Sequence, residues 1–383
     1  IASLPALLVV WAFLPDPRGA MGWMAWWIWV SFLSLVLGRQ TVRAILIVVR
    51  RMGLLRRRVA VVGTGPLADG IVHRMTTEMS HDDFELIGTI DPAANTFRHH
   101  VSGATATSED FVLYVQEHGL DLLVVALPWS RSQELYALVH RLQWIAADVV
   151  VPFDAGGLRP SFAPPLAFVD GPVLQLMHRP FKGSQGLIKA VEDYVVASIA
   201  LLLVSPIMAL AALAIKLEGK GPIIFKQPRV GFNSKPFMIY KFRSMTVDPT
   251  DDGSRQATKG DQRVTRVGAF LRKTSIDELP QLINVLRGEM SIVGPRPHVS
   301  NMQVGGTGVY SEIVQQYAAR HRIKPGITGW AQINGMRGGI ETLEKATRGA
   351  ELDLHYVANW SPKLDLEIMI RTVVAGLVGR NVF

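Results

Sequence analysis

One uncharged apolar run limits what this chain can fold into more than any other feature. Val195–Ile215 contains no charged residue and matches the ~20 apolar residues that a helix needs to cross a bilayer. Ser205 and Pro206 stand at its centre. Proline removes a helix hydrogen bond and clashes with the preceding turn, so it kinks or breaks a helix. The sequence therefore predicts a membrane-associated helix that is interrupted near its middle.

The residues on both sides of this run are basic. Lysines precede it at positions 182 and 189 and follow it at positions 216 and 220. Basic flanks favour the cytoplasmic face of a membrane, whereas a straight span would place one flank outside. We therefore predict a re-entrant hairpin over residues 191–216, in which the Ser205 hydroxyl bonds a carbonyl that Pro206 frees. A proline-kinked transmembrane helix is the alternative.

Two more apolar segments open the chain. Ile1–Leu14 and Gly19–Gly38 are uncharged, and the second has the length of a bilayer span, with tryptophans that suit the interface. Arginines follow at positions 39, 43, 50, 51, 56, 57 and 58. By the positive-inside rule that side is cytoplasmic, so we expect transmembrane helices within residues 1–50. A buried helical pair in a soluble core is the alternative. Because the chain begins with Ile, we expect its natural N-terminus to be missing.

Residues 57–155 alternate predicted strands with helical patterns, which favours a Rossmann-like α/β domain with a doubly wound parallel sheet. Gly63 and Gly65 fit the pattern G-x-G-x-x-[G/A] after the first strand, and Asp91 ends the second, where an acid can bond a ribose. Pro66 removes an N–H from this turn, so a domain that binds no nucleotide is the alternative. Residues 156–181 begin with a Gly/Pro-rich stretch and are predicted to be a linker.

The region after the apolar run interleaves basic residues and glycines with short apolar stretches. At its centre, Asp277 and Glu278 lie just before Pro280. Proline is tolerated in the first turn of a helix, so we expect a helix to begin just before Pro280, with Ser275 or Asp277 as N-cap. Ser275 and Glu278 also fit a capping box, which is the purely structural alternative.

Capping does not explain two adjacent carboxylates in basic surroundings. The nearby basic residues are Arg272, Lys273, Arg287 and Arg296. Neighbouring residues near a helix start point in different directions, so one carboxylate can attack phosphorus while the other holds Mg²⁺. The helix N-terminus and the arginines would keep both carboxylates ionised and would bind a diphosphate.

Four motifs of this region closely resemble the bacterial sugar transferase family, the monotopic phosphoglycosyl transferases that start polysaccharide synthesis on a polyprenyl carrier. The motifs are FKQPRVG, YKFRSM, LRKTSIDELPQLINVLRGEMSIVGPRP and KPGITGWAQINGMRG. The resemblance covers residues 182–383 almost continuously. It implies a membrane α/β protein of the bacterial inner membrane: N-terminal transmembrane helices, a Rossmann-like domain, then a re-entrant helix with a mixed, helix-rich cytoplasmic catalytic domain.

The resemblance also implies a mechanism. Asp277 would attack the β-phosphate of a UDP-sugar, UMP would leave, and undecaprenyl phosphate would then attack the aspartyl-phosphosugar. Glu278 would be the Mg²⁺ ligand. The implied phosphate ligands are Arg272 and Arg296, and the implied phosphate or uridine contacts are Lys241 and Arg243. The C-terminal HYVANWSPKLDLEIMIRTV resembles undecaprenyl-phosphate glucose phosphotransferases of exopolysaccharide pathways, which favours glucose-1-phosphate over the alternative, galactose-1-phosphate.

Charge and composition restrict the remaining classes. The chain has no cysteine, which excludes disulfides, Cys-based metal sites and a thiol nucleophile. The net charge of +8 indicates an anionic partner, but the excess flanks membrane segments and the phosphate motifs, so we expect no nucleic acid. A membrane-anchored nucleotide-sensing scaffold is the alternative from another class. An NAD-linked oxidoreductase is disfavoured because residues 58–150 lack a Tyr-x-x-x-Lys pair. We expect a homodimer, with the middle domain as the dimerisation element.

Overall fold

The computed structural model describes most of the chain. The described residues are 17–51, 56–77, 84–100, 103–127, 133–134, 137, 142, 145–152, 173–178, 180–181, 184–246, 261–299, 302–304, 308–310, 314, 317–336, 338–340 and 342–378. The first apolar segment, at 1–14, and the Gly/Pro-rich stretch of the linker lie outside them. The chain divides into two compact units, residues 1–57 with 76–85 and residues 58–75 with 86–383.

Helix α2, Pro17–Arg51, is one continuous helix of 35 residues that includes the uncharged segment Gly19–Gly38. Its side chains at Trp26, Trp29 and Leu35 are exposed. Within the part of the chain that the structure describes, only helix α6 (Gln185–Glu218) is long and apolar enough to be a candidate for crossing a membrane. The expected set of N-terminal transmembrane helices therefore stays a prediction.

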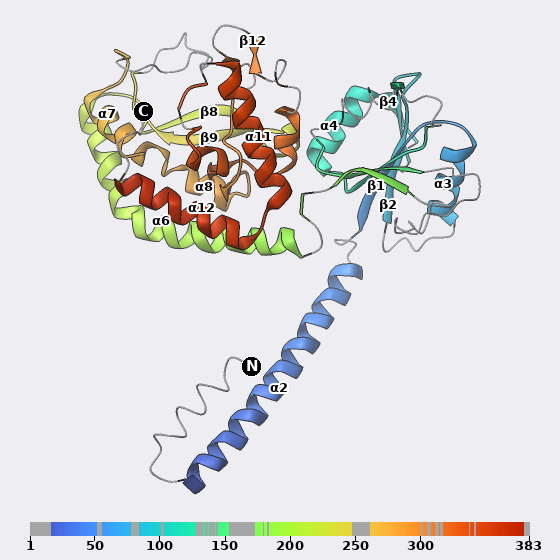
Figure 1. Cartoon of the computed structure of the whole chain (residues 1–383), viewed down its shortest axis with the longest axis horizontal. Helices are drawn as coiled ribbons and strands as arrows, with labels where there is room; N and C mark the ends of the chain where they lie inside the picture. The colour runs from blue at the N-terminus through green and yellow to red at the C-terminus, as the bar shows by residue number, and fades with distance from the viewer. Residues whose placement is uncertain are drawn as a thin grey trace. The chain divides into compact units, whose positions relative to one another are not determined.

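A seven-stranded sheet forms the core of residues 57–177, in the order β4-β3-β2-β1-β5-β6-β7. Its strands are β1 (Arg57–Val62), β2 (Phe84–Asp91), β3 (Thr96–His99), β4 (Thr105–Thr107), β5 (Leu122–Val125), β6 (Asp148–Pro152) and β7 (Val173–Met177). Helices α3 (Pro66–Thr77) and α4 (Ser108–His118) lie on opposite sides of it (Figure 1). Strand β5 is buried at every residue, as expected for a central strand covered on both faces.

The predicted all-parallel sheet is correct only at the centre. β1 pairs with β5, and β5 with β6, in parallel. In contrast, the β2–β3, β3–β4 and β6–β7 pairs are antiparallel. β2 and β3 are joined by a turn over residues 92–95. This turn is too short for the crossover that parallel strands need, so β3 must run back along β2.

The glycine turn after β1 has a structural explanation. Gly63 has φ +129°, and a Cβ there would lie 2.4 Å from the carbonyl oxygen of Ala126, so only glycine fits. Gly65 also has positive φ, at +102°. The Asp91 carboxylate accepts two backbone N–H groups of the turn that follows it, at 2.9 and 3.2 Å. Packing and turn formation account for these residues, and nucleotide binding here stays a prediction.

The C-terminal part is helix-rich and contains short two-stranded sheets (Figure 1). Its helices are α6, α7 (Arg266–Lys273), α8 (Gln281–Leu286), α10 (Trp330–Ile333), α11 (Leu343–Asn359) and α12 (Pro362–Val378), with 3-10 turns η2 (Phe232–Ser234), η3 (Ile276–Glu278) and η4 (Tyr317–Arg322). Its strands are β8 (Ile224–Val230), β9 (Pro236–Phe242), β10 (Ser291–Val293), β11 (Gln303–Val304), β12 (Gly308–Val309) and β13 (Gly326–Thr328). β8 and β9 form an antiparallel hairpin, and β10 pairs with β13 in parallel.

Helix α6 runs through Pro206 without interruption, so the predicted break is absent. The Leu202 carbonyl, which the missing proline N–H would have bonded, accepts the Ser205 hydroxyl at 2.9 Å. The predicted role of Ser205 is therefore confirmed, and it explains why the helix continues. Figure 1 shows that α6 bends along its length instead of splitting into two helices.

Both halves of α6 pack against the same domain. Ala197, before the proline, belongs to a buried cluster with Ile239 of β9. Ile215, after it, belongs to another with Phe242 of the same strand. Between them, Leu202 and other apolar side chains are exposed. One face of the helix therefore packs on the folded body along its length, and its other face leaves apolar side chains exposed.

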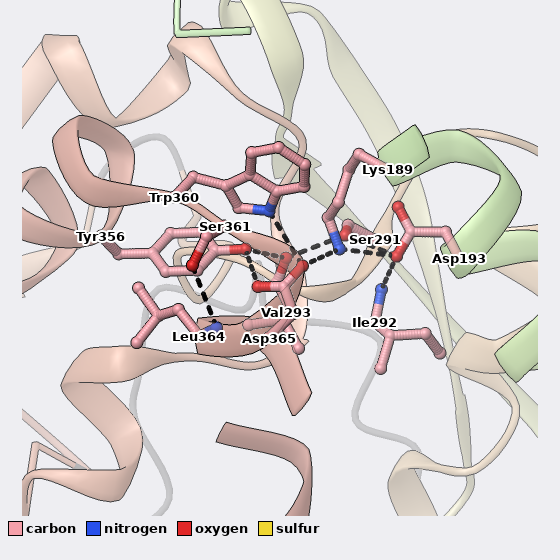
Figure 2. Close-up of polar contacts among 10 residues, drawn as sticks. All are labelled: Lys189, Asp193, Ser291, Ile292, Val293, Tyr356, Trp360, Ser361, Leu364 and Asp365. Atoms are coloured by element: carbon pink, nitrogen blue, oxygen red, sulfur yellow. Dashed lines mark hydrogen bonds and ion pairs between the residues drawn. The ribbon is translucent and has the colours of Figure 1, made fainter. Parts of the chain in front are cut away.

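A buried ion network joins the first half of α6 to the core (Figure 2). Lys189 Nζ lies 2.8 Å from an oxygen of Asp193 and 2.9 Å from an oxygen of Asp365. Asp193 also accepts the Ser291 hydroxyl at 2.8 Å and the Ile292 N–H at 2.9 Å, both on β10. The prediction that Lys189 is a flanking charge at the membrane is thus wrong: its side chain is only 6% exposed.

The second acid of this network also holds α11 and α12 together. Asp365 accepts the Tyr356 hydroxyl at 2.6 Å and the Trp360 indole N–H at 2.9 Å. Ile368 faces the core beside them, whereas Leu366 and Ile370 are exposed. Helix α12 thus packs with one face on the core and leaves apolar side chains on its other face.

Candidate active site

Asp277 and Glu278 lie on the 3-10 turn η3, before helix α8 rather than inside its first turn. Pro280 is the N-cap residue of α8, whereas Ser275 is the N-cap residue of η3. The prediction of Ser275 as N-cap is therefore correct for the 3-10 turn and wrong for the α-helix. Ser275 caps nothing with its side chain and adopts left-handed backbone with φ +57°. The capping box is therefore absent. Left-handed backbone at a non-glycine residue is a strained feature of the kind found at functional sites.

The Glu278 carboxylate lies between two cations. Its Oε1 accepts from Lys241 Nζ at 2.8 Å and from Arg296 Nη2 at 2.7 Å. Burial by itself raises the pKa of Glu278, but the charges of Arg296 and Lys241 outweigh burial and hold that pKa well below its usual value. Glu278 is therefore ionised at neutral pH.

The neighbouring carboxylate has the opposite tendency. Asp277 is 9% exposed, and its burial raises its pKa above the ordinary value. Lys241 lowers the pKa of Asp277, the charge of Glu278 raises it, and Arg272 and Arg296 lower it. Two adjacent acids with pKa values displaced in opposite directions can take different roles, one as a more basic nucleophile and one as a permanent anion.

Asn284 fixes the strand that carries Lys241. This residue is fully buried on α8; its Oδ1 accepts the Tyr240 N–H at 3.0 Å and its Nδ2 donates to the Met238 carbonyl at 2.8 Å. Lys241 is the next residue of β9, and its side chain contacts Glu278 of η3. Asn284 is not among the residues predicted from sequence, although a polar residue among apolar helical positions is a usable signal of such a role.

Arg320 similarly fixes the segment that carries Arg296. Its guanidinium donates to the Arg296 carbonyl at 2.7 Å, lies 2.9 Å from His298 Nδ1, and pairs with Asp353 at 2.7 Å. The sequence analysis missed this residue too. Nothing in the sequence indicated that Arg320 would be buried against Asp353 of α11.

Arg243 lies away from the two carboxylates. Its guanidinium donates to the carbonyls of Ile215 at 3.1 Å, Gly219 at 2.9 Å and Lys220 at 2.8 Å, at the C-terminal end of α6. The last carbonyls of a helix lack partners within the helix, and Arg243 supplies them. These contacts give Arg243 a structural role at the end of α6, and its predicted contact with phosphate or uridine stays a prediction.

The donor set fits a metal held jointly with a phosphorylated substrate. Within the described residues, no three His or acidic side chains gather into a metal site. Mg²⁺ commonly binds through one or two carboxylates together with substrate phosphates and water. The ionised Glu278, beside Asp277, suits that arrangement, and Lys241 and Arg296 both bind the same oxygen of its carboxylate, Oε1.

Comparison with known proteins decides the family. Residues 184–379 match the bacterial sugar transferase family, and residues 4–151 match the CoA-binding domain family. An undecaprenyl-phosphate glucose phosphotransferase of Komagataeibacter xylinus is 38% identical over 384 residues, covering 98% of this chain and 69% of the relative. The chain belongs to the bacterial sugar transferase family. The predicted resemblance is confirmed, and this sugar transferase is an enzyme of the phosphoglycosyl transferase class.

Two further relatives show how similarity is distributed. The UDP-glucose:undecaprenyl-phosphate glucose-1-phosphate transferase of Escherichia coli K12 is 38% identical over 366 residues, covering 94% of this chain and 76% of the relative. A UDP-N-acetylgalactosamine-undecaprenyl-phosphate N-acetylgalactosaminephosphotransferase of Aeromonas hydrophila is 42% identical over 192 residues, covering 50% of this chain and 44% of the relative. The two relatives described here that are named for glucose therefore match along nearly the whole chain.

Replacing Arg243 with Met should destabilise the fold rather than impair substrate binding. The change removes the donor for three carbonyls at the end of α6, and an unmet buried group costs about 1–3 kcal/mol, so the free energy of unfolding should fall by roughly that amount. Denaturant unfolding in detergent measures this, with the exposed Arg266→Met as the control. Unchanged stability combined with a raised KM for nucleotide sugar would return Arg243 to the substrate site.

Proposed function

We propose that this sugar transferase moves glucose-1-phosphate from UDP-glucose to undecaprenyl phosphate, releases UMP, and so begins exopolysaccharide synthesis at the cytoplasmic face of the bacterial inner membrane. The observation that carries the proposal is the Asp277–Glu278 pair on one strained turn, with Lys241 and Arg296 on the Glu278 carboxylate. The names of the two relatives that match along most of the chain support the substrates.

Asp277 acts as the nucleophile. One of its carboxylate oxygens forms a bond to the β-phosphorus of UDP-glucose. The bond from that phosphorus to the bridging oxygen breaks, and the electron pair leaves with UMP. The product is an aspartyl-phosphosugar, and the burial of Asp277 restricts the access of water that would hydrolyse it.

The second half-reaction regenerates the enzyme. An oxygen of undecaprenyl phosphate attacks the same phosphorus, the bond to the Asp277 carboxylate breaks, and the lipid diphosphate sugar leaves. Arg296 and Lys241 stabilise the negative charge that develops on the phosphoryl oxygens in both steps. Glu278 would hold Mg²⁺, which when bound neutralises diphosphate charge. Arg272, whose charge lowers the pKa of Asp277, completes the basic surroundings.

Helix α6 supports a re-entrant attachment to the membrane. Its two halves pack on Ile239 and Phe242 of one strand, so both ends lie on the same side of a bilayer. Leu202, Leu203 and Leu210 lie between those contacts and are 76%, 71% and 68% exposed. Exposing these apolar side chains to water is unfavourable, whereas contact with lipid is not. The active site would then stand at the depth of the lipid phosphate.

UMP release from a panel of UDP-sugars tests the proposal, with the full chain in lipid nanoparticles, undecaprenyl phosphate and Mg²⁺. We expect release from UDP-glucose, and removal of the metal with EDTA should suppress it. Release from UDP-galactose alone would keep the reaction class and replace glucose by galactose. Absence of release from every UDP-sugar by well-folded protein would contradict the proposed transferase reaction.

A further inference from the structure

Arg229 of β8 is a further guanidinium near the catalytic pair, and the mechanism above does not use it. The β8–β9 register sets Arg229 opposite Phe237 and Phe225 opposite Lys241. Directly opposed residues, and those two positions along a strand, share one face of a hairpin. Arg229 therefore lies on the same face as Lys241, which binds Glu278. A bond from the Val230 N–H to the His298 carbonyl, at 3.1 Å, ties this end of β8 to the segment that carries Arg296.

Among the described residues, no carboxylate pairs directly with Arg229; the charge of the nearby Glu278 raises its pKa, but Glu278 is already bound by Lys241 and Arg296. The Arg229 guanidinium donates from Nη2 to the neutral Gln227 side-chain oxygen at 2.6 Å. Its Nε is buried and has no hydrogen-bond partner there. Burial and the like charge of Arg296 lower the pKa of Arg229 to about 10, so the guanidinium is still protonated at neutral pH. A protonated, partly desolvated donor without a partner needs an anion.

The balance of charge points to the same conclusion. Glu278 already accepts from both Lys241 and Arg296 through a single oxygen. Arg229 adds a third positive charge near that acid, and Arg272 a further one near Asp277. The site thus has an excess of positive charge, which suits the two negative charges of a nucleoside diphosphate sugar. Guanidinium groups match phosphate oxygens with paired donors.

We propose that Arg229 binds the diphosphate of the nucleotide sugar, together with Arg296 and Lys241. The proposal rests on the function proposed above and adds one residue to its substrate site. Gln227 orients the guanidinium without neutralising it, which leaves its charge for the substrate. The bound phosphate supplies the partner that Nε lacks.

Binding measured without turnover tests the proposal independently of activity. Calorimetric titration of UDP-glucose with Mg²⁺ would use the full chain carrying Asp277→Asn, with and without Arg229→Gln. We expect Arg229→Gln to weaken binding roughly 10- to 100-fold, the scale of a lost charged hydrogen bond, and Arg229→Lys to restore part of it. Lys226→Gln, an exposed charge on the other face of the same hairpin, should change binding by less than about 2-fold.

Steady-state kinetics separate the two phosphates that Arg229 could serve. In the otherwise unaltered enzyme, Arg229→Gln should raise the KM for UDP-glucose while leaving the KM for undecaprenyl phosphate within about 2-fold. A rise only in the KM for the lipid, or unchanged UDP-glucose binding in well-folded protein, would overturn the proposal. If the unaltered enzyme released no UMP, the proposed function would fail, and the titration would still decide whether Arg229 binds the diphosphate.

Discussion

Replacing Asp277 with Asn is expected to reduce the release of UMP by about 10⁴-fold or more, because the amide cannot form the covalent bond to phosphorus. Asp277 is the buried member of the pair, whereas Glu278 is fixed by Lys241 and Arg296. Asparagine has nearly the same shape as aspartate, so substrate binding should persist. The rate of UMP release, measured with UDP-glucose, Mg²⁺ and lipid phosphate for both proteins, gives this fold-reduction. Retained turnover would contradict a covalent role for Asp277.

The stability of the same variant provides the control. Burial raises the pKa of Asp277, which means that the folded state favours its protonated form. The stabilisation from that protonation is present below the unfolded pKa and is lost as the pH rises through the raised folded value. At neutral pH the ionised Asp277 therefore costs stability, and Asp277→Asn should leave the melting temperature unchanged or raise it. A large decrease would mean that lost activity reflects lost structure.

Replacing Lys189 with Met should lower the free energy of unfolding by about 3–5 kcal/mol, the cost of breaking a buried ion pair from one side. Asp193 and Asp365 would be left facing each other without the cation that lies 2.8 and 2.9 Å from them. The change would loosen α6 from β10 and α12 together. Denaturant unfolding in detergent measures it.

Two companion variants make the Lys189 result specific. Lys216→Met removes an exposed charge from the other end of the same helix and should change stability by less than about 1 kcal/mol. Adding Asp193→Asn and Asp365→Asn to Lys189→Met removes the uncompensated charges and should recover part of the loss. A loss below about 1 kcal/mol for Lys189→Met would show that the network does not secure the helix.

The candidate catalytic pair and its basic neighbours could be predicted to lie together because the motifs that carry them are local. Asp277 and Glu278 are adjacent, and the structure brings Lys241 and Arg296 to the same carboxylate. The role of Ser205 was also predictable, since the carbonyl that Pro206 frees lies within one helical turn of it. Such features depend on residues only a few positions apart or on motifs dense in charge.

The contacts that were not predicted involve residues whose partners are distant in the sequence. Arg243 is two residues after Lys241, so strand alternation would put both side chains on the same face. However, β9 ends at Phe242, and the Arg243 side chain binds the end of α6 instead. Lys189 reads as a membrane flank because its partner Asp365 is remote in sequence. The antiparallel pairs at the edges of the sheet depend on the direction in which each connection brings the chain back to the sheet. The residue pattern of a strand does not specify that direction.

The mass of the intact protein after incubation with UDP-glucose and Mg²⁺, without lipid phosphate, tests the central claim most directly. A covalent role for Asp277 predicts a fraction of protein heavier by one hexose phosphate, with the modification on Asp277 and an equal amount of UMP released. Addition of undecaprenyl phosphate should remove the modification and yield the lipid product. Release of UMP only when the lipid is present, with no adduct at Asp277 at any time, would contradict the account and indicate direct transfer between the two substrates.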